Sequence, residues 1–119
     1  MSVPRFLANH DPTEAIPLGV TRREPAIEFL RLRDRGMAGK PDPEVLAYTA
    51  ANHLLVVSLD VNTMTAYASR LIADGEPMPG IFLAHQRDSI AAVIDDLILI
   101  WSSSQAEEWL NQIVFLPLR

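Results

Sequence analysis

The stretch Val56 to Met64 reads VVSLDVNTM, an apolar run that passes directly into an aspartate and then into a polar segment. The run begins at Leu54, and its continuous Val and Leu content is typical of a parallel strand buried on both faces. Asp60 ends this predicted strand, and a helix is expected from Thr63. An acid at the end of a strand is either a helix cap or a metal ligand, and both interpretations are open for Asp60.

On both sides of this stretch, short apolar runs alternate with longer amphipathic ones, as is typical of α/β proteins. Strands are expected at 3–8, 26–32, 54–59, 80–84 and 113–116, and helices at 13–23, 42–52, 63–73, 88–101 and, in short form, from 104. Pro17 is expected to shorten or kink the first helix. Because helices separate the strands, we expect a mostly parallel sheet with right-handed crossovers.

Length, charge and composition exclude several classes of protein. The 119 residues predict one domain over residues 1–119, and a net charge of −5 argues against non-specific nucleic-acid binding. An activity on RNA would therefore need a local basic patch or a metal ion. The chain has no cysteine, which excludes disulfides and thiolate metal sites. No apolar run is long enough for a bilayer and no secretory signal is recognised, so a soluble cytoplasmic protein without membrane contact is expected.

Several carboxylates fall near predicted strand ends or helix starts. Asp11 follows the first strand, Asp42 and Glu44 open the helix before the third strand, and Asp60 ends that strand. Ligands in parallel sheets bind outside the carboxyl ends of the strands, and hard cations such as Mg²⁺ and Mn²⁺ take oxygen ligands there. Helix capping explains Asp42 equally well, with Pro43 at the first helical position, and the helix dipole explains Glu44.

Other groups give weaker signals. The histidines His10, His53 and His85 show no metal-ligand spacing. No nucleophile elbow or phosphate-binding glycine loop is present. The one basic cluster is either a solvated surface or a phosphate-contacting stripe, and it consists of Arg22, Arg23, Arg31, Arg33 and Arg35. Trp101 and Trp109 mark either core packing or a surface for a homo-oligomer.

A resemblance extends over nearly the whole chain. The segments FLA, GMAGKPDPEVLAYTA, VVSLDVNTM, GEPMPGIFL and EEW followed by IVFLPL occur in an order that resembles small bacterial PIN-like proteins. The resemblance implies a three-layer α/β/α sandwich with a mostly parallel PIN-like sheet. It also implies kinship with PIN-domain nucleases, which cleave RNA with Mg²⁺ or Mn²⁺ held by clustered acids. Many of these are toxins neutralised by a small antitoxin protein.

The match to the family's acids is uneven. The family's first strand ends in Asp-Glu-Asn, where this chain has Asn9-His10-Asp11, so the leading metal ligand is an amide. Asp11 lies two residues further along and is a candidate substitute. The family's acid before the Pro-Glu pair is present as Asp42, and the acid that ends the third strand is present as Asp60. A second acid, two residues later in many members, is replaced by Asn62.

The resemblance and the acids together predict a metal-dependent endoribonuclease that forms the toxin half of a toxin–antitoxin pair. The expected catalytic and metal-binding residues are Asp60, Asp42 and Asp11, with Glu44 as a further metal ligand and Asn9 and Thr63 at the substrate. The amides at Asn9 and Asn62 leave a second interpretation open, in which a degenerate PIN-like protein serves as a partner module. A receiver-domain interpretation is set aside, because the only lysine, Lys40, lies in an early loop.

Overall fold

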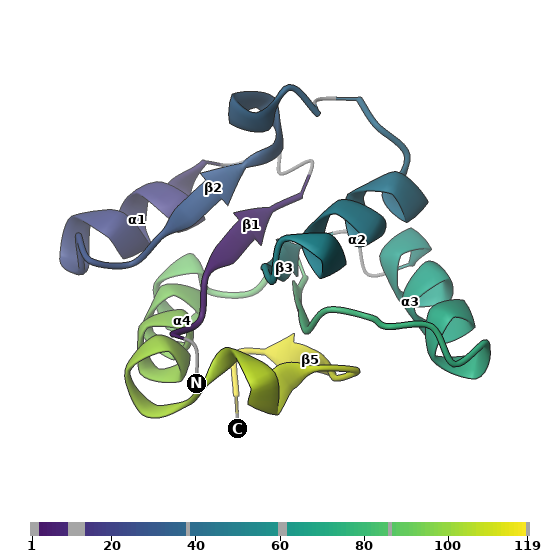
Figure 1. Cartoon of the computed structure of the whole chain (residues 1–119). Coiled ribbons are helices and arrows are strands. Elements are labelled where there is room, and N and C mark those ends of the chain that lie inside the picture. Colours follow the sequence, from purple (N-terminus) through teal and green to yellow (C-terminus); the bar gives the residue numbers. More distant parts are fainter. Residues whose placement is uncertain (1–2, 10–13, 38, 60–61, 86, 119) are drawn as a thin grey trace.

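The computed structural model describes residues 3–9, 14–37, 39–59, 62–85 and 87–118 (Figure 1). The elements in chain order are β1 (Phe6–Ala8), α1 (Ala15–Arg23), β2 (Phe29–Arg31), the 3-10 helix η1 (Leu32–Arg35), α2 (Asp42–Ala51), β3 (Leu55–Ser58), α3 (Thr63–Ala73), β4 (Ile81–Ala84), α4 (Ile90–Ser103), the 3-10 helix η2 (Ala106–Trp109) and β5 (Ile113–Leu116). The chain is thus an α/β protein, as its alternating pattern predicts.

The five strands form one sheet in the order β2-β1-β3-β4-β5, and every neighbouring pair is parallel. Strand β3 occupies the centre, and its four residues are all buried, which explains why the VVSL run carries no polar alternation. This order is that of flavodoxin-like doubly wound sheets. The expected three-layer α/β/α sandwich with a parallel sheet is confirmed.

The helices cover the sheet in pairs. Helices α1 and α4 lie together on one face, and α2 and α3 lie on the other (Figure 1). The alternation of side chains along the strands follows these layers. Val57 and Phe82 pack in the cluster beneath α1 and α4, whereas Val56 and Ile81 pack beneath α2 and α3. A third small cluster around Leu7 completes the packing under α2.

The crossovers do not all share one hand. The connections β1–α1–β2 and β4–α4–β5 run in opposite directions across the sheet, yet α1 and α4 cover the same face. Two crossovers on one face that run in opposite directions have opposite hands. The crossovers through α2 and α3 run in the direction opposite to that of α1 and lie on the opposite face, so they have the same hand as α1. The expectation of uniformly right-handed crossovers is therefore wrong for α4. In this position α4 helps α1 to cover Phe82 and its neighbours.

The elements near the amino terminus are shorter than the sequence predicts. Strand β1 begins at Phe6 instead of residue 3, and β2 ends at Arg31 because Leu32 already starts a 3-10 turn. Helix α1 begins at Ala15, so Pro17 lies in its first turn. An amide in the first turn has no helical partner, and Pro17 is therefore accommodated without a kink.

Near the carboxyl terminus, the short helix expected from 104 is the 3-10 helix η2, which begins at Ala106 and has a capping box between Gln105 and Glu108. Trp109 packs edge-on against Phe82 at 5.2 Å between ring centroids, and its Nε1 donates a hydrogen bond to Ser104 Oγ at 2.8 Å. Trp101 is partly buried against the same core cluster. Core packing therefore accounts for both tryptophans.

Candidate functional site

The carboxyl edge of the sheet between β1 and β3 is the place where this topology forms a site. From β1 the chain proceeds to β2 on one side, whereas β3, β4 and β5 follow on the other side. The adjacent crossovers therefore leave β1 and β3 on opposite faces of the sheet, and doubly wound sheets bind their ligands outside the carboxyl ends of two such strands. Asn9 follows β1 at this edge, and Ser58 is the last residue of β3.

Asn9 is held firmly at this edge. Its side chain is buried, with 1% of its surface exposed, and its backbone amide donates to the Val57 carbonyl at 3.0 Å. Its Nδ2 donates to Ser58 Oγ at 3.5 Å. Its Oδ1 is buried and accepts no hydrogen bond from any residue that the structure describes. A buried carbonyl oxygen without a donor costs about 1–3 kcal/mol, so an external donor or a cation at this point would be stabilising.

Asp42 begins α2 at the same edge and is 9% exposed. Pro41 is the residue that caps the helix, and no side-chain capping hydrogen bond forms. The expectation that Asp42 is the N-cap is therefore wrong by one residue, and capping does not explain its carboxylate. Val45 and Leu46, three and four residues later, are fully buried against the sheet. Because residues at these spacings share a helix face, Asp42 lies on the side of α2 that faces the sheet.

Asn9, Ser58 and Asp42 thus approach the edge from the same face of the sheet. Asn9 lies two residues after Leu7, which packs beneath α2 in the cluster with Val45. Ser58 lies two residues after Val56, which packs beneath α2 and α3. Side chains two apart on a strand share a face, so all three residues lie on the α2 side. This small set offers a carboxylate, an amide oxygen and a hydroxyl, which are the oxygen donors that hard cations accept.

Glu44 does not join this set. It lies two residues after Asp42, which places it about 200° further around the helix axis. Its side chain is 57% exposed, and its Oε2 lies 3.9 Å from Lys40 Nζ. The structure therefore places Glu44 on the solvent side of the first turn of α2, where the helix dipole favours an acid.

The predicted ligands Asp11 and Asp60 lie outside the described residues, as does His10. Within residues 3–9, 14–37, 39–59, 62–85 and 87–118, no group of three or more histidine, aspartate or glutamate side chains lies close enough to hold a metal ion. Asp42 is thus the one predicted carboxylate ligand that the structure places at the edge. The other two are known from sequence position alone.

Thr63 lies beside this edge at the start of α3. It is exposed, and it lines an open depression of about 450 Å³ together with Asn62, Ala66, Tyr67 and Arg70. The depression adds a guanidinium, on Arg70, two turns along the helix from Thr63. Such an arrangement of hydroxyl, amide and guanidinium groups suits an anionic ligand.

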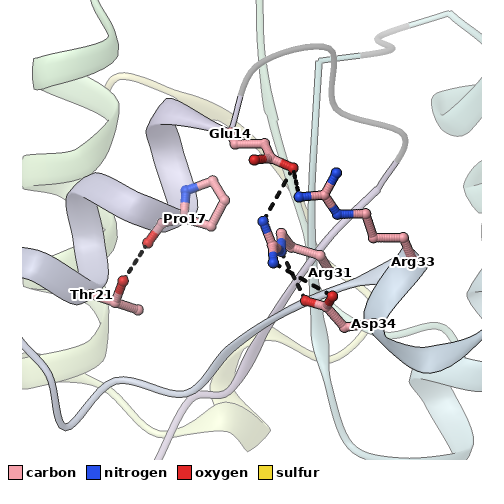
Figure 2. A network of polar contacts seen from close by, with 6 residues as sticks. All are labelled: Glu14, Pro17, Thr21, Arg31, Arg33 and Asp34. Carbon is pink, nitrogen blue, oxygen red and sulfur yellow. Dashed lines mark hydrogen bonds and ion pairs between the residues drawn. The ribbon is translucent and has the colours of Figure 1, made fainter.

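The arginine cluster near the amino terminus is neutralised by neighbouring acids. Arg31 and Arg33 both form ion pairs with Glu14, and Arg31 Nε also donates to Asp34 at 2.8 Å (Figure 2). The hydrogen bond and the charge of Asp34, followed by Glu14, raise the pKa of Arg31 above its ordinary value. These contacts are exposed and contribute little to stability.

Two of the three remaining members of the cluster also have partners. Arg23 pairs with Asp95 on α4, and Arg35 Nε donates to Tyr48 Oη at 3.0 Å. Most of the predicted phosphate-contacting stripe therefore has a partner within the protein. This favours the interpretation of the cluster as a solvated surface.

Two residues of the site carry no signal in the sequence. Ser58 lies within an otherwise apolar strand, and nothing in the sequence indicates its contact with Asn9. Arg70 is an isolated basic residue on a helix, and only its helical register with Thr63 places it in the depression.

A second, smaller cavity of about 90 Å³ lies at the opposite, amino edge of the sheet. Its lining is mostly apolar and includes Leu54, Met78 and Leu110, together with His53 and Thr49. None of the predicted site residues borders it. The cavity is therefore separate from the candidate site.

Comparison with known proteins returns no family model, no curated protein and no solved structure that matches this chain. Among the described helices, none combines the length and the apolar character that a membrane crossing requires.

Proposed function

We propose that this chain is a PIN-like, metal-dependent endoribonuclease that cleaves single-stranded RNA at the carboxyl edge between β1 and β3. The proposal is supported by two residues on the α2 side of this edge: Asp42, which is buried at the start of α2 without serving as its cap, and Asn9, whose buried Oδ1 has no donor among the described residues. A nearly buried carboxylate and an orphaned carbonyl oxygen on the same side of one edge suit a divalent cation.

The residues divide the work as follows. Asp42 and Asp60 supply the negative charge that holds Mg²⁺ or Mn²⁺, and Asp11 or Asn9 completes the set of oxygen ligands. A cation bound there lowers the pKa of a water molecule and offsets charge on the phosphate. Thr63 orients a phosphate oxygen through its hydroxyl, and Arg70 in the same depression contacts a neighbouring phosphate.

The charge of the molecule supports this dependence on a metal. The net charge is −5, and Arg23, Arg31 and Arg33 of the arginine cluster form ion pairs with acids. These acids offset much of the positive charge that the cluster would offer to an RNA backbone. A divalent cation at the carboxyl edge, together with Arg70 two turns along α3, would add positive charge for the RNA.

The test is the cleavage of single-stranded RNA in the presence of Mn²⁺. We expect the wild type to cleave and the Asp60→Ala variant to lose the activity. Asp95→Asn is the matched control, because Asp95 is an exposed acid on α4, on the opposite face of the sheet. Equal cleavage by the wild type and Asp60→Ala, or no cleavage by the wild type, would contradict the catalytic assignment.

We further propose that the protein acts in the cytoplasm as the toxin half of a toxin–antitoxin pair. The support is the resemblance of the whole chain to PIN-like proteins. A short antitoxin-like reading frame beside the gene, whose product binds this chain and suppresses the Mn²⁺-dependent cleavage, is the expected finding. Growth arrest that persists when the two are produced together would contradict it.

A second candidate function is a non-catalytic partner module with a degenerate site. The observation in its favour is that the leading ligand position is an amide, Asn9, whose Nδ2 contacts Ser58 Oγ within the fold. This function predicts no heat of Mn²⁺ binding. It also predicts a complex with the product of a neighbouring gene that survives Asp60→Ala, whereas Mn²⁺ binding that this substitution abolishes would exclude it.

A further inference from the structure

Strand β5 lies at one edge of the sheet, so one side of its backbone has no neighbouring strand (Figure 1). The amide of Ile81 on β4 donates to the Gln112 carbonyl at 3.0 Å, so Gln112 directs its backbone groups toward β4. Backbone direction alternates along a strand, and Val114 and Leu116 therefore also face β4. Ile113 and Phe115, by the same alternation, direct their amide and carbonyl groups outward from the sheet.

The side chains of this edge are equally open. Natural sheets protect an edge with charged residues, proline within the strand or a covering element. The four residues of β5, IVFL, contain neither a charge nor a proline, and Pro117 comes only after the strand. The α2 and α3 side of β5 is only partly covered. Phe115 on that side stacks on His85 with 5.8 Å between ring centroids and is still 49% exposed, and Ile113 is partly exposed.

We propose that two copies of this chain form a two-fold dimer in which their β5 strands pair antiparallel and join the two sheets into one. With Val114 on the two-fold axis, Ile113 of one copy lies opposite Phe115 of the other. This register places the outward amides and carbonyls of each pair opposite each other, which gives four hydrogen bonds. It also makes two cross-strand pairs of a β-branched and an aromatic residue on the same face, which are favourable in antiparallel sheets.

The surroundings of the strand are self-complementary in the same register. The exposed Leu110 precedes β5 and the exposed Leu118 follows it. The two-fold axis brings Leu110 of one copy toward Leu118 of the other. The amino end of β5 follows the exposed acids Glu107 and Glu108, whereas Arg87 lies beyond the carboxyl end of β4. Antiparallel pairing therefore places acids of one copy near a base of the other. Because both the apolar residues and the opposite charges of this edge are self-complementary, a second copy of the chain is the partner that fits β5.

The pairing has a consequence for the carboxyl edge. Because the two sheets run antiparallel, the candidate sites between β1 and β3 of the two copies lie at opposite ends of the dimer. Each site is then formed by one chain alone.

The first test is the mass in solution by sedimentation equilibrium. We expect the wild type to approach twice the 13.2 kDa of one chain as the protein concentration rises, and Phe115→Lys to remain a single chain. Leu18→Lys is the matched control, because Leu18 is 43% exposed on α1, which connects β1 and β2 at the other end of the sheet. It should dimerise as the wild type does. A wild type that remains a single chain, or a Phe115→Lys dimer, would overturn the proposal.

A second test does not depend on loss of folding. The chain has no cysteine, so Val114→Cys introduces a single thiol. On the two-fold axis, two Val114 residues form a non-hydrogen-bonded pair with Cα atoms about 4.5 Å apart, within disulfide range. Mild oxidation should link Val114→Cys into covalent dimers and leave Leu18→Cys mostly unlinked. Equal linkage of the two variants, or none in Val114→Cys, would overturn the proposed register.

Discussion

At the scale of single residues, Asn9 shows how a buried polar group connects the fold with the proposed chemistry. Its backbone amide and Nδ2 hold β1 and β3 together, while its Oδ1 is left without a donor among the described residues. Most buried polar atoms in proteins have a partner, and an exception at a topological switch point is where the proposed cation would bind. In this proposal the Nδ2 of Asn9 contacts Ser58 within the sheet, and its Oδ1 is a ligand of the cation.

Replacement of Asn9 by aspartate tests this interpretation. The Asn9→Asp variant keeps the shape of the side chain and adds a negative charge that is buried in the absence of metal. We expect its free energy of unfolding to fall by about 1–3 kcal/mol or more without metal. We expect Mn²⁺ to restore most of this loss, because a ligand that binds only the folded state stabilises it.

Urea unfolding with and without Mn²⁺ measures both effects. Asn52→Asp is a suitable control, because Asn52 lies at the end of α2, away from the carboxyl edge. An Asn9→Asp variant whose destabilisation is the same with and without Mn²⁺ would show that this position does not approach a cation.

At the scale of elements, two glycines set how closely neighbouring segments approach. A Cβ at Gly80, just before β4, would lie 2.7 Å from Trp109 Cβ and 2.8 Å from its carbonyl oxygen. A Cβ at Gly19 on α1 would lie 2.4 Å from Cδ1 of Ile94 on α4. The first contact is with backbone that is fixed by β5 and η2, whereas the second is with the end of a flexible side chain.

We therefore expect Gly80→Ala to destabilise the fold more than Gly19→Ala. Overpacking against fixed atoms costs about 1–3 kcal/mol, whereas a side-chain tip can move at lower cost. Denaturant unfolding of the two variants gives the comparison. A smaller loss for Gly80→Ala than for Gly19→Ala would mean that η2 moves more readily than α4.

Ser89 is the N-cap of helix α4. The Ser89 Oγ accepts a hydrogen bond from the Ala92 amide at 3.2 Å, which is an N-cap interaction. Ser89→Ala should lower the free energy of unfolding by about 1 kcal/mol, and Ser89→Gly by only a few tenths. Thermal unfolding of both variants measures this difference, and an equal effect of the two would argue against a capping role.

At the scale of the whole molecule, the sequence predicts the layers better than their arrangement. The continuous VVSL run and the amphipathic segments identify strands and helices, because burial on one face or on both leaves a periodic pattern. Nothing in that pattern states on which face α4 lies, because the Val93, Ile94 and Leu97 stripe fits either face equally well. The different hand of this crossover is visible only in the folded chain.

The candidate site follows the same division. The position of Asp42 at a helix start was predictable, because Pro43 and Glu44 mark the first turn. Pro41 rather than Asp42 caps the helix because Pro41 has extended backbone angles and Asp42 is already helical. The position of Pro43 in the sequence does not determine these angles. The contact of Ser58 with Asn9 requires the pairing of β1 with β3, which are separated by a long stretch of sequence. Such long-range pairings leave no local signal.

The central claim is that a divalent cation binds at the carboxyl edge between β1 and β3, with Asp42 as a ligand. Removal of one unit charge about 4 Å from a divalent cation costs about 8 kcal/mol at an effective dielectric constant of about 20, twice the value for two unit charges. A tenfold change in affinity corresponds to only about 1.4 kcal/mol. Calorimetric titration of Mn²⁺ into the wild type, Asp42→Asn and the control Asp95→Asn is therefore the most direct test. We expect similar Mn²⁺ binding by the wild type and Asp95→Asn and more than a tenfold loss of affinity in Asp42→Asn. Unchanged affinity in Asp42→Asn, or no binding by the wild type, would contradict it.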